Sequence, residues 1–206
     1  MCKRIVKVGA DLFPPYQYFT ADGNVNGIDY EKVFSIFSKA GYKIDVVIDE
    51  SWSVIQEMFD QGKLDAAFQV QPTPERLQKY LFSDKLRDAV TEVVTSNKDL
   101  KIESYPQIEE LNLKLGVIAG YTNGPEIDAL DESVKFPYSN AVDLLFAVSR
   151  GEVDLAVYDK GVKEYLMEEN GITNIVSIES MTFTRPLHVI FNDPVLRDEF
   201  NAAMSE

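Results

Sequence analysis

Segments patterned as β-strands alternate along this chain with segments patterned as amphipathic helices. In the first half, strands are expected at residues 3–10, 43–48 and 64–70, with helices between them at residues 29–41 and 53–61. Apolar residues three and four positions apart mark the helices, and short apolar runs mark the strands. This alternation predicts parallel βαβ units, so the chain should have an α/β fold.

Local signals set the expected helix ends. The second helix should open with a capping box made by Ser53 and Gln56. Near the C-terminus, Asp193 should cap a last helix that has Pro194 at its first position. The apolar face of this last helix, which includes Phe200, should pack back on the first part of the chain.

The second half of the chain repeats the scheme, with strands expected at residues 113–120 and 153–159. Within it, "AVSRGEVDLAV" aligns with "MFDQGKLDAAF" of the first half. We therefore expect two similar lobes, lobe 1 at residues 1–93 and 188–206 and lobe 2 at residues 94–187. Each should have a mostly parallel sheet flanked by helices. Two crossing strands would form a hinge, and a hinge predicts a cleft that closes on a ligand.

The net charge of −14 argues against a nucleic-acid partner, because phosphate binding depends on clustered Lys and Arg. It also argues against docking on an anionic membrane surface. Because Cys2 is the single cysteine, we expect no internal disulfide and no Cys/His metal cluster. We also expect no bound metal and no cofactor. The first residues contain no apolar h-region, so any export signal is expected to be missing or removed. Cys2 is either the lipid-bearing residue of a processed lipoprotein or an incidental residue.

The stretch "FQVQPTPERL", residues 68–77, leaves an apolar strand and places an arginine at the start of a predicted helix. Thr73 suits the N-cap and Pro74 the first helical position, so Arg76 falls at the third. Free N–H groups and the helix dipole favour an anion there, and a guanidinium matches a carboxylate with two hydrogen bonds. The sequence thus predicts that the helix start around Arg76 binds a carboxylate group of a ligand, and we call this predicted site the carboxylate seat. The alternative is a surface arginine paired with a nearby acid.

Other candidate ligand residues follow the ends of predicted strands, where ligands bind in open α/β sheets. Asp159 suits an ammonium group, or it caps the helix that follows, and both roles can coexist. Aromatic residues in loops or at a helix start are candidates for the wall of a ligand slot or for core packing. These aromatic residues are Phe13, Tyr16, Tyr18 and Trp52. The polar and aromatic candidates at strand ends are Gln69, Gln71, Tyr121 and Thr122.

Three stretches carry a resemblance to a known family. In "GKLDAAFQVQPTPERLQKYLFSD", a strand end leads to T-x-x-R and then F-[ST]-D, which is the most specific of the three patterns. "FPPYQYFTADGNVNGIDYEKV" has an aromatic-proline loop and a G-[FI]-D before the first helix, and "SRGEVDLAVYD" ends in an acid. Over nearly its whole length, the chain resembles the amino-acid-binding type II solute-binding proteins of ABC transporters, the bacterial extracellular solute-binding family 3.

The resemblance implies a two-lobed periplasmic-binding-protein type II fold and a non-catalytic role. A small zwitterionic ligand, a polar amino acid, would be captured in the interlobe cleft and delivered to the membrane permease of an ABC transporter. The protein would be periplasmic and monomeric. The resemblance maps the α-carboxylate clamp to Arg76, with Thr122 and Tyr121 helping, and the α-ammonium group to Asp159. It also maps a pair of aromatic residues around the ligand side chain to Phe13 and Trp52.

The chain departs from the family pattern where Gln69 and Gln71 stand in place of small residues, and where "GYTNG" replaces a turn with two small hydroxyl residues. These changes narrow or repolarise the pocket, so the identity of the ligand stays open. Two alternatives also stay open. One is a dehydratase-like enzyme with an acid such as Glu50, although the single histidine, His188, lies in a predicted crossing strand and no G-x-S-x-G elbow is present. The other is the ligand-sensing domain of a receptor.

Overall fold

The computed structural model describes residues 4–205, and the chain divides into two compact units. Unit 1 comprises Met1–Asp88 and Pro186–Glu206, and unit 2 comprises Ala89–Arg185. The long strands β7 (Arg87–Thr95) and β11 (Val176–Phe191) both contain a boundary between the units. The lobe boundaries expected from the sequence, after residues 93 and 187, fall in the same two strands and stay a prediction.

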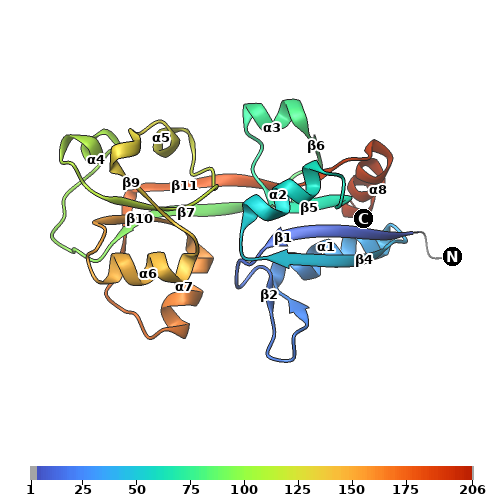
Figure 1. Cartoon of the computed structure of the whole chain (residues 1–206), viewed down its shortest axis with the longest axis horizontal. Helices are drawn as coiled ribbons and strands as arrows, with labels where there is room; N and C mark the ends of the chain where they lie inside the picture. Colours follow the sequence, from blue (N-terminus) through green and yellow to red (C-terminus); the bar gives the residue numbers. More distant parts are fainter. Residues whose placement is uncertain (1–3, 206) are drawn as a thin grey trace. The chain divides into compact units, whose positions relative to one another are not determined.

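The sheet of unit 1 has the strand order β4-β1-β5-β11 (Figure 1). Its central strand, β1 (Ile5–Asp11), pairs in parallel with β4 (Lys43–Asp49) and with β5 (Ala66–Val70). On the far side of β5, β11 runs antiparallel and also pairs with the short β6 (Leu81–Phe82). The parallel strands place the carboxyl ends of β1 and β5 at the same edge of the sheet.

In the described part of unit 1, the helices are α1 (Ile28–Lys39), α2 (Trp52–Asp60), α3 (Pro74–Lys79) and α8 (Pro194–Met204). The core is formed where α1 and α8 pack with strand residues such as Val8. Phe37 of α1 and Phe200 of α8 are both fully buried, with ring centroids 4.9 Å apart. The expected return of the last helix to the first part of the chain is confirmed, as are its cap Asp193 and the following proline.

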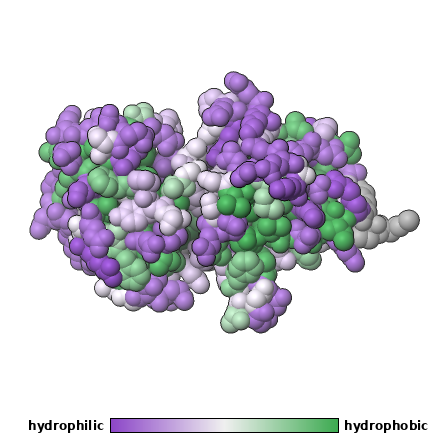
Figure 2. All heavy atoms as spheres, viewed as in Figure 1, coloured by the Kyte–Doolittle hydropathy of each residue, from purple (hydrophilic) through white to green (hydrophobic). Residues whose placement is uncertain are grey.

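Two smaller elements lie outside this core. A two-stranded ribbon, β2 (Tyr18–Phe19) and β3 (Val25–Asn26), precedes α1. Helix α3 has no buried residue, and Figure 2 shows mostly hydrophilic side chains over it. The first turn of α3 is therefore open to solvent on one side of unit 1.

The sheet of unit 2 has the order β7-β10-β8-β9. Strand β8 (Leu115–Ile118) pairs in parallel with β10 (Leu155–Asp159) and β9 (Lys135–Tyr138), whereas β7 is antiparallel to β10. Helix α6 (Ala141–Ser149) packs against β8 at a glycine. A Cβ atom added to that glycine, Gly116, would lie 2.3 Å from the Leu144 side chain, so a larger residue there would require Leu144 to move.

The remaining helices of unit 2 are α4 (Pro106–Glu110), α5 (Pro125–Asp128), the 3-10 turn η1 (Glu132–Val134) and α7 (Lys160–Glu169). Its apolar core joins β7, β8 and β10 to α4 and α5. Helix α7 is tied to the sheet by a buried ion pair between Lys163 and Glu92, and Ser177 contacts both charged groups. The α/β fold that the sequence predicted is confirmed in both units.

Candidate functional site

Arg76 lies where the sequence placed it, at the third position of the short helix α3. The Thr73 side chain is the N-cap and accepts a hydrogen bond from the Arg76 backbone N–H at 3.3 Å, and Pro74 is the first helical residue. The Arg76 guanidinium donates through Nη1 to the carbonyl of Gln71, also at 3.3 Å. The loop that leaves β5 thus holds the guanidinium of Arg76, and the cap of α3 holds its backbone.

Trp52 lies beside Arg76 in unit 1. It is the first residue of α2 and is 6% exposed, and the Arg76 guanidinium carbon lies 5.8 Å from the centre of its ring. Among residues 4–205, its indole Nε1 is buried without a hydrogen-bond partner. A buried indole N–H without a partner costs free energy, and such a group is a ready donor for a bound ligand.

The start of α2 differs from the expectation. Ser51, not Ser53, is the N-cap, and Val54 and Ile55 donate their backbone N–H groups to the Ser51 carbonyl. The expected capping box at Ser53 is therefore wrong. Gln56, expected to close that box, donates its side-chain amide to the Tyr80 hydroxyl at 3.3 Å. A tertiary partner from the end of α3 has replaced the local one.

The aromatic-proline loop is held against the start of α1. The rings of Phe13 and Tyr16 stack, with centroids 5.8 Å apart. The carbonyl of Tyr16 accepts the backbone N–H of Asp29 at 2.9 Å, in the first turn of α1. Gly27 permits this approach, since its φ is +129° and an added Cβ would lie 2.3 Å from the Tyr16 oxygen. The glycine of the G-I-D motif thus brings Tyr16 next to Asp29.

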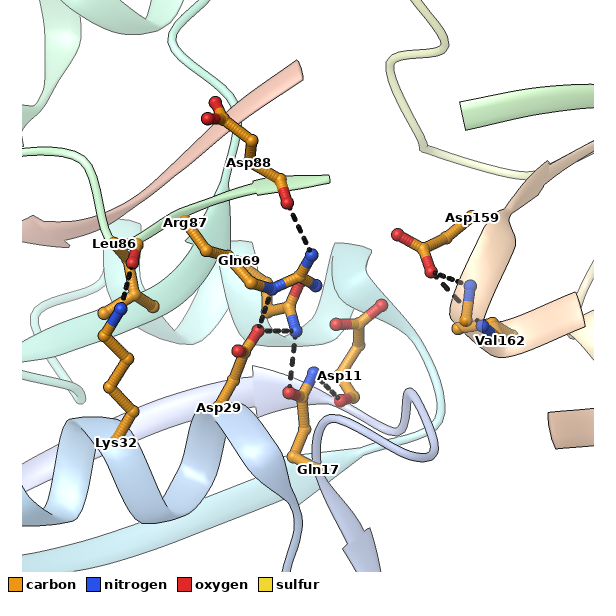
Figure 3. Close-up of polar contacts among 11 residues, drawn as sticks. Asp11, Gln17, Asp29, Lys32, Gln69, Leu86, Arg87, Asp88, Asp159 and Val162 are labelled. Carbon is orange, nitrogen blue, oxygen red and sulfur yellow. Dashed lines mark hydrogen bonds and ion pairs between the residues drawn. The ribbon is translucent and has the colours of Figure 1, made fainter. Parts of the chain in front are cut away.

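A polar network lies between this loop and the end of β5 (Figure 3). Gln69, which has a φ of +70°, donates its amide to the Asp29 carboxylate and, at 3.0 Å, to Oε1 of Gln17. The Gln17 amide donates in turn to the backbone carbonyl of Asp11 at 2.9 Å. Arg87, at the start of β7, donates through Nε to the same Asp29 carboxylate at 2.7 Å. The sequence singled out Gln69 and Tyr16 as ligand-binding candidates, which stays a prediction, and it did not single out Arg87 or Asp29.

Sequence reasoning missed Asp29 and Arg87 for different reasons. Asp29 is 1% exposed, although its place in the first turn of a helix is typical of a solvated acid. Arg87 is 58 positions away from it, so no local pattern links them. A signal existed for Asp29 alone, because it falls on the same helical face as the buried Val33 and Ile36.

In unit 2, Asp159 ends β10 and caps α7. Its Oδ1 accepts the backbone N–H groups of Gly161 at 2.9 Å and Val162 at 3.2 Å (Figure 3). The capping role considered from the sequence is therefore confirmed, while its role toward an ammonium group stays a prediction. Thr91 of β7 lies directly opposite Asp159, is 1% exposed, and has a hydroxyl without a hydrogen-bond partner in the part of the chain that the structure describes. Sequence reasoning did not single out Thr91.

The other two candidates of unit 2 lie in the loop after β8. The backbone N–H of Tyr121 donates to the Ile118 carbonyl at 3.2 Å. The Thr122 carbonyl accepts Nη1 of Arg185 at 2.6 Å, and Asn123 binds the Asp128 carboxylate through its backbone N–H. These contacts order the turn in which the sequence expected a carboxylate-binding hydroxyl at Thr122.

Two further features concern metal binding and membrane crossing. No group of three or more His, Cys, Asp or Glu side chains within residues 4–205 is placed to hold a metal ion. Nor does any helix in that range combine the length and the apolar character that crossing a membrane requires. Cys2, the residue considered for a lipid anchor, lies outside the described residues.

Comparison with known proteins gives a family match over almost the entire chain. Residues 6–206 match the bacterial extracellular solute-binding proteins, family 3. The "Arginine-binding extracellular protein ArtP" of Bacillus subtilis (strain 168) is 27% identical over 210 residues, which cover 99% of this chain and 80% of that protein. The "Probable histidine-binding protein" of Neisseria gonorrhoeae is 25% identical over 162 residues, which cover 77% of this chain and 59% of the relative's length.

The fold also matches solved structures. "An ancestral arginine-binding protein bound to arginine" superposes with a TM-score of 0.86 at 20% identity, covering all of this chain and 92% of that one. At this level of identity the likeness concerns the fold. The type II binding-protein fold expected from the sequence is thereby confirmed.

Proposed function

The chain belongs to the bacterial extracellular solute-binding proteins, family 3, and from that premise we propose that it captures a small zwitterionic ligand, a polar amino acid. The relatives named as arginine- and histidine-binding proteins support an amino acid as the class of ligand. In this proposal the protein delivers its ligand to the membrane permease of an ABC transporter and acts as a monomer in the periplasm. Cys2 is its proposed site of lipid anchoring.

The geometry around Arg76 in unit 1 carries the proposal. A capped helix start, an arginine at its third position and a tryptophan alongside make a seat suited to a carboxylate. A guanidinium–carboxylate pair that excludes water contributes on the order of 1.5–3 kcal/mol per charged hydrogen bond. The indole N–H of Trp52 is a further donor of the right polarity for the same carboxylate.

We further propose that Asp159 of unit 2 holds the ligand ammonium group and that Thr122 assists with the carboxylate. Burying a zwitterion requires that each charge be paired, and these residues with Arg76 supply one partner of each sign. Phe13, Tyr16 and Trp52 would then contact the ligand side chain. A ligand that contacts both units would shift the population toward a closed form, and the permease would recognise that form.

The proposed role is non-catalytic. His188 is held in β11, where its Nδ1 lies 2.8 Å from the carbonyl of Ser83, and this contact supports a structural role. The dehydratase alternative predicts turnover of prephenate-like substrates, which a direct assay measures. The sensor alternative uses the same binding chemistry, and an attached transmembrane or kinase segment in the full gene product would favour it.

A thermal-shift screen against the common amino acids tests the proposal. A ligand at a hundredfold excess over its Kd stabilises the folded state by about 2.7 kcal/mol. Arg76→Ala should abolish the shift while the apo protein keeps its melting temperature, since α3 has no buried residue. Gln78→Ala, on the exposed face of the same helix, is the matched control and should respond like the wild type. A wild-type response that survives in Arg76→Ala contradicts the proposed seat.

A further inference from the structure

Arg87 is enclosed by three kinds of group in unit 1. Its guanidinium carbon lies 3.8 Å from the centre of the Tyr16 ring. One edge of the group donates through Nε to the Asp29 carboxylate at 2.7 Å, and Nη2 donates to Oε1 of Gln69 at 3.1 Å. The Arg87 side chain is only 15% exposed, so this contact set is not a loose surface pair.

The partners of Arg87 are themselves held in place. Asp29 is buried in the first turn of α1, and its backbone N–H binds the Tyr16 carbonyl. The side-chain NH2 group of Gln69 donates hydrogen bonds to Asp29 and to Gln17. Its side-chain carbonyl oxygen accepts a hydrogen bond from Arg87 (Figure 3). All of these residues lie in unit 1. The arrangement is therefore complete within a single compact unit.

The aromatic face of Tyr16, the buried carboxylate of Asp29 and the amide oxygen of Gln69 together suit a guanidinium or ammonium group, and we call these three groups the recognition set. The aromatic face attracts a cation, and the carboxylate and the amide oxygen accept its N–H donors. In this chain the set is already filled by the chain's own arginine. Two of its members, Tyr16 and Gln69, are also candidate ligand residues, so the filled set lies at the site where the ligand side chain is expected.

We propose that Arg87 is a specificity-determining residue that excludes ligands with a cationic side chain. This inference rests on the proposed amino-acid-binding function. Arg87 fills a set of contacts that would suit a ligand guanidinium and neutralises Asp29, so a second cation meets the positive charge of Arg87 instead of the Asp29 carboxylate. The ligand is then an amino acid without a cationic side chain, unlike the arginine bound by the ancestral protein of the same fold.

Isothermal titration calorimetry of the wild type with L-arginine, L-lysine, L-glutamine, L-asparagine, L-serine and L-threonine gives the first test. The inference predicts that an amino acid without a cationic side chain binds at least about tenfold more tightly than L-arginine or L-lysine. Binding of L-arginine or L-lysine as the tightest ligand overturns the inference and leaves the proposed function standing. If no common amino acid binds, the proposed function fails and the inference fails with it.

Two variants separate the effect of the Asp29 charge from the effect of the space that the Arg87 side chain leaves. Arg87→Ala exposes the Asp29 carboxylate and the Tyr16 face, and should gain at least about tenfold in L-arginine affinity. The double variant Arg87→Ala with Asp29→Asn has the same added space without the charge and should show no such gain. Equal gains in both variants, or none in the single variant, overturn the inference.

A small probe provides a readout that does not depend on amino-acid binding. Ethylguanidinium should raise the melting temperature of Arg87→Ala by refilling the vacated place, and should leave the wild type and the double variant unchanged. Equal responses of all three proteins overturn the inference. If Arg87→Ala folds only in the presence of ethylguanidinium, Arg87 is needed for folding, and the wild-type calorimetry alone decides the inference.

Discussion

Replacement of Asp159 by asparagine or by alanine should separate its structural role from its proposed binding role. Asp159 caps α7 with two hydrogen bonds to Oδ1, of 2.9 and 3.2 Å. Asparagine is as good an N-cap as aspartate, so Asp159→Asn loses only the favourable charge at the helix start, about 0.3–1 kcal/mol. Alanine removes the cap as well, and Asp159→Ala should cost about 1 kcal/mol more than the asparagine variant.

The two variants should nevertheless lose similar amounts of ligand affinity, because both lack the charge proposed to hold the ammonium group. A charged hydrogen bond of about 1.5–3 kcal/mol corresponds to a loss of roughly 10- to 150-fold in Kd. Urea denaturation of the ligand-free proteins measures the stability difference, and isothermal titration calorimetry measures the affinities. If Asp159→Asn binds the ligand as tightly as the wild type, Asp159 is a cap and the ammonium assignment is wrong.

Two further predictions concern stability. Phe37→Ala opens a cavity between α1 and α8, where the Phe37 and Phe200 rings lie 4.9 Å apart, and should cost about 3–5 kcal/mol in urea denaturation; a cost under about 1 kcal/mol would contradict the described core. Burial raises the pKa of the Tyr158 phenol above its ordinary value. The unfolded chain releases this proton near pH 10, so the stability that neutral Tyr158 contributes is present below about pH 10 and is lost as the pH rises further. The fall in unfolding free energy above about pH 10 should therefore be smaller in Tyr158→Phe than in the wild type, and identical pH profiles would contradict this.

The sequence was most informative where structure depends on near neighbours. The capped start of α3 was predicted correctly because Thr73 and Pro74 act within one helical turn. The last helix was likewise predicted with its cap and its packing face, since Asp193 and the apolar spacing up to Phe200 are local signals. Helix periodicity and strand runs gave the α/β class for the same reason.

Contacts between distant residues could not be read in this way. The capping box at Ser53 failed because α2 begins at Trp52 with Ser51 as its N-cap, and the Gln56 amide has a partner, Tyr80, 24 positions away. The pairing of Arg87 with Asp29 links two elements through the fold, and neither residue stood out by itself. Sequence reasoning therefore located the capped helix start at which we propose that a carboxylate binds, but missed the cluster that we propose sets the ligand's side-chain class.

The central claim is that Arg76 binds the ligand carboxylate, and a thermodynamic cycle in calorimetry tests it most directly. The tightest amino acid from the screen and its α-carboxamide, which lacks the negative charge, are each titrated into the wild type and into Arg76→Ala. We predict that the wild type binds the amino acid roughly 10- to 150-fold more tightly than the amide and that Arg76→Ala shows no preference. An unchanged preference in Arg76→Ala would show that the carboxylate binds elsewhere.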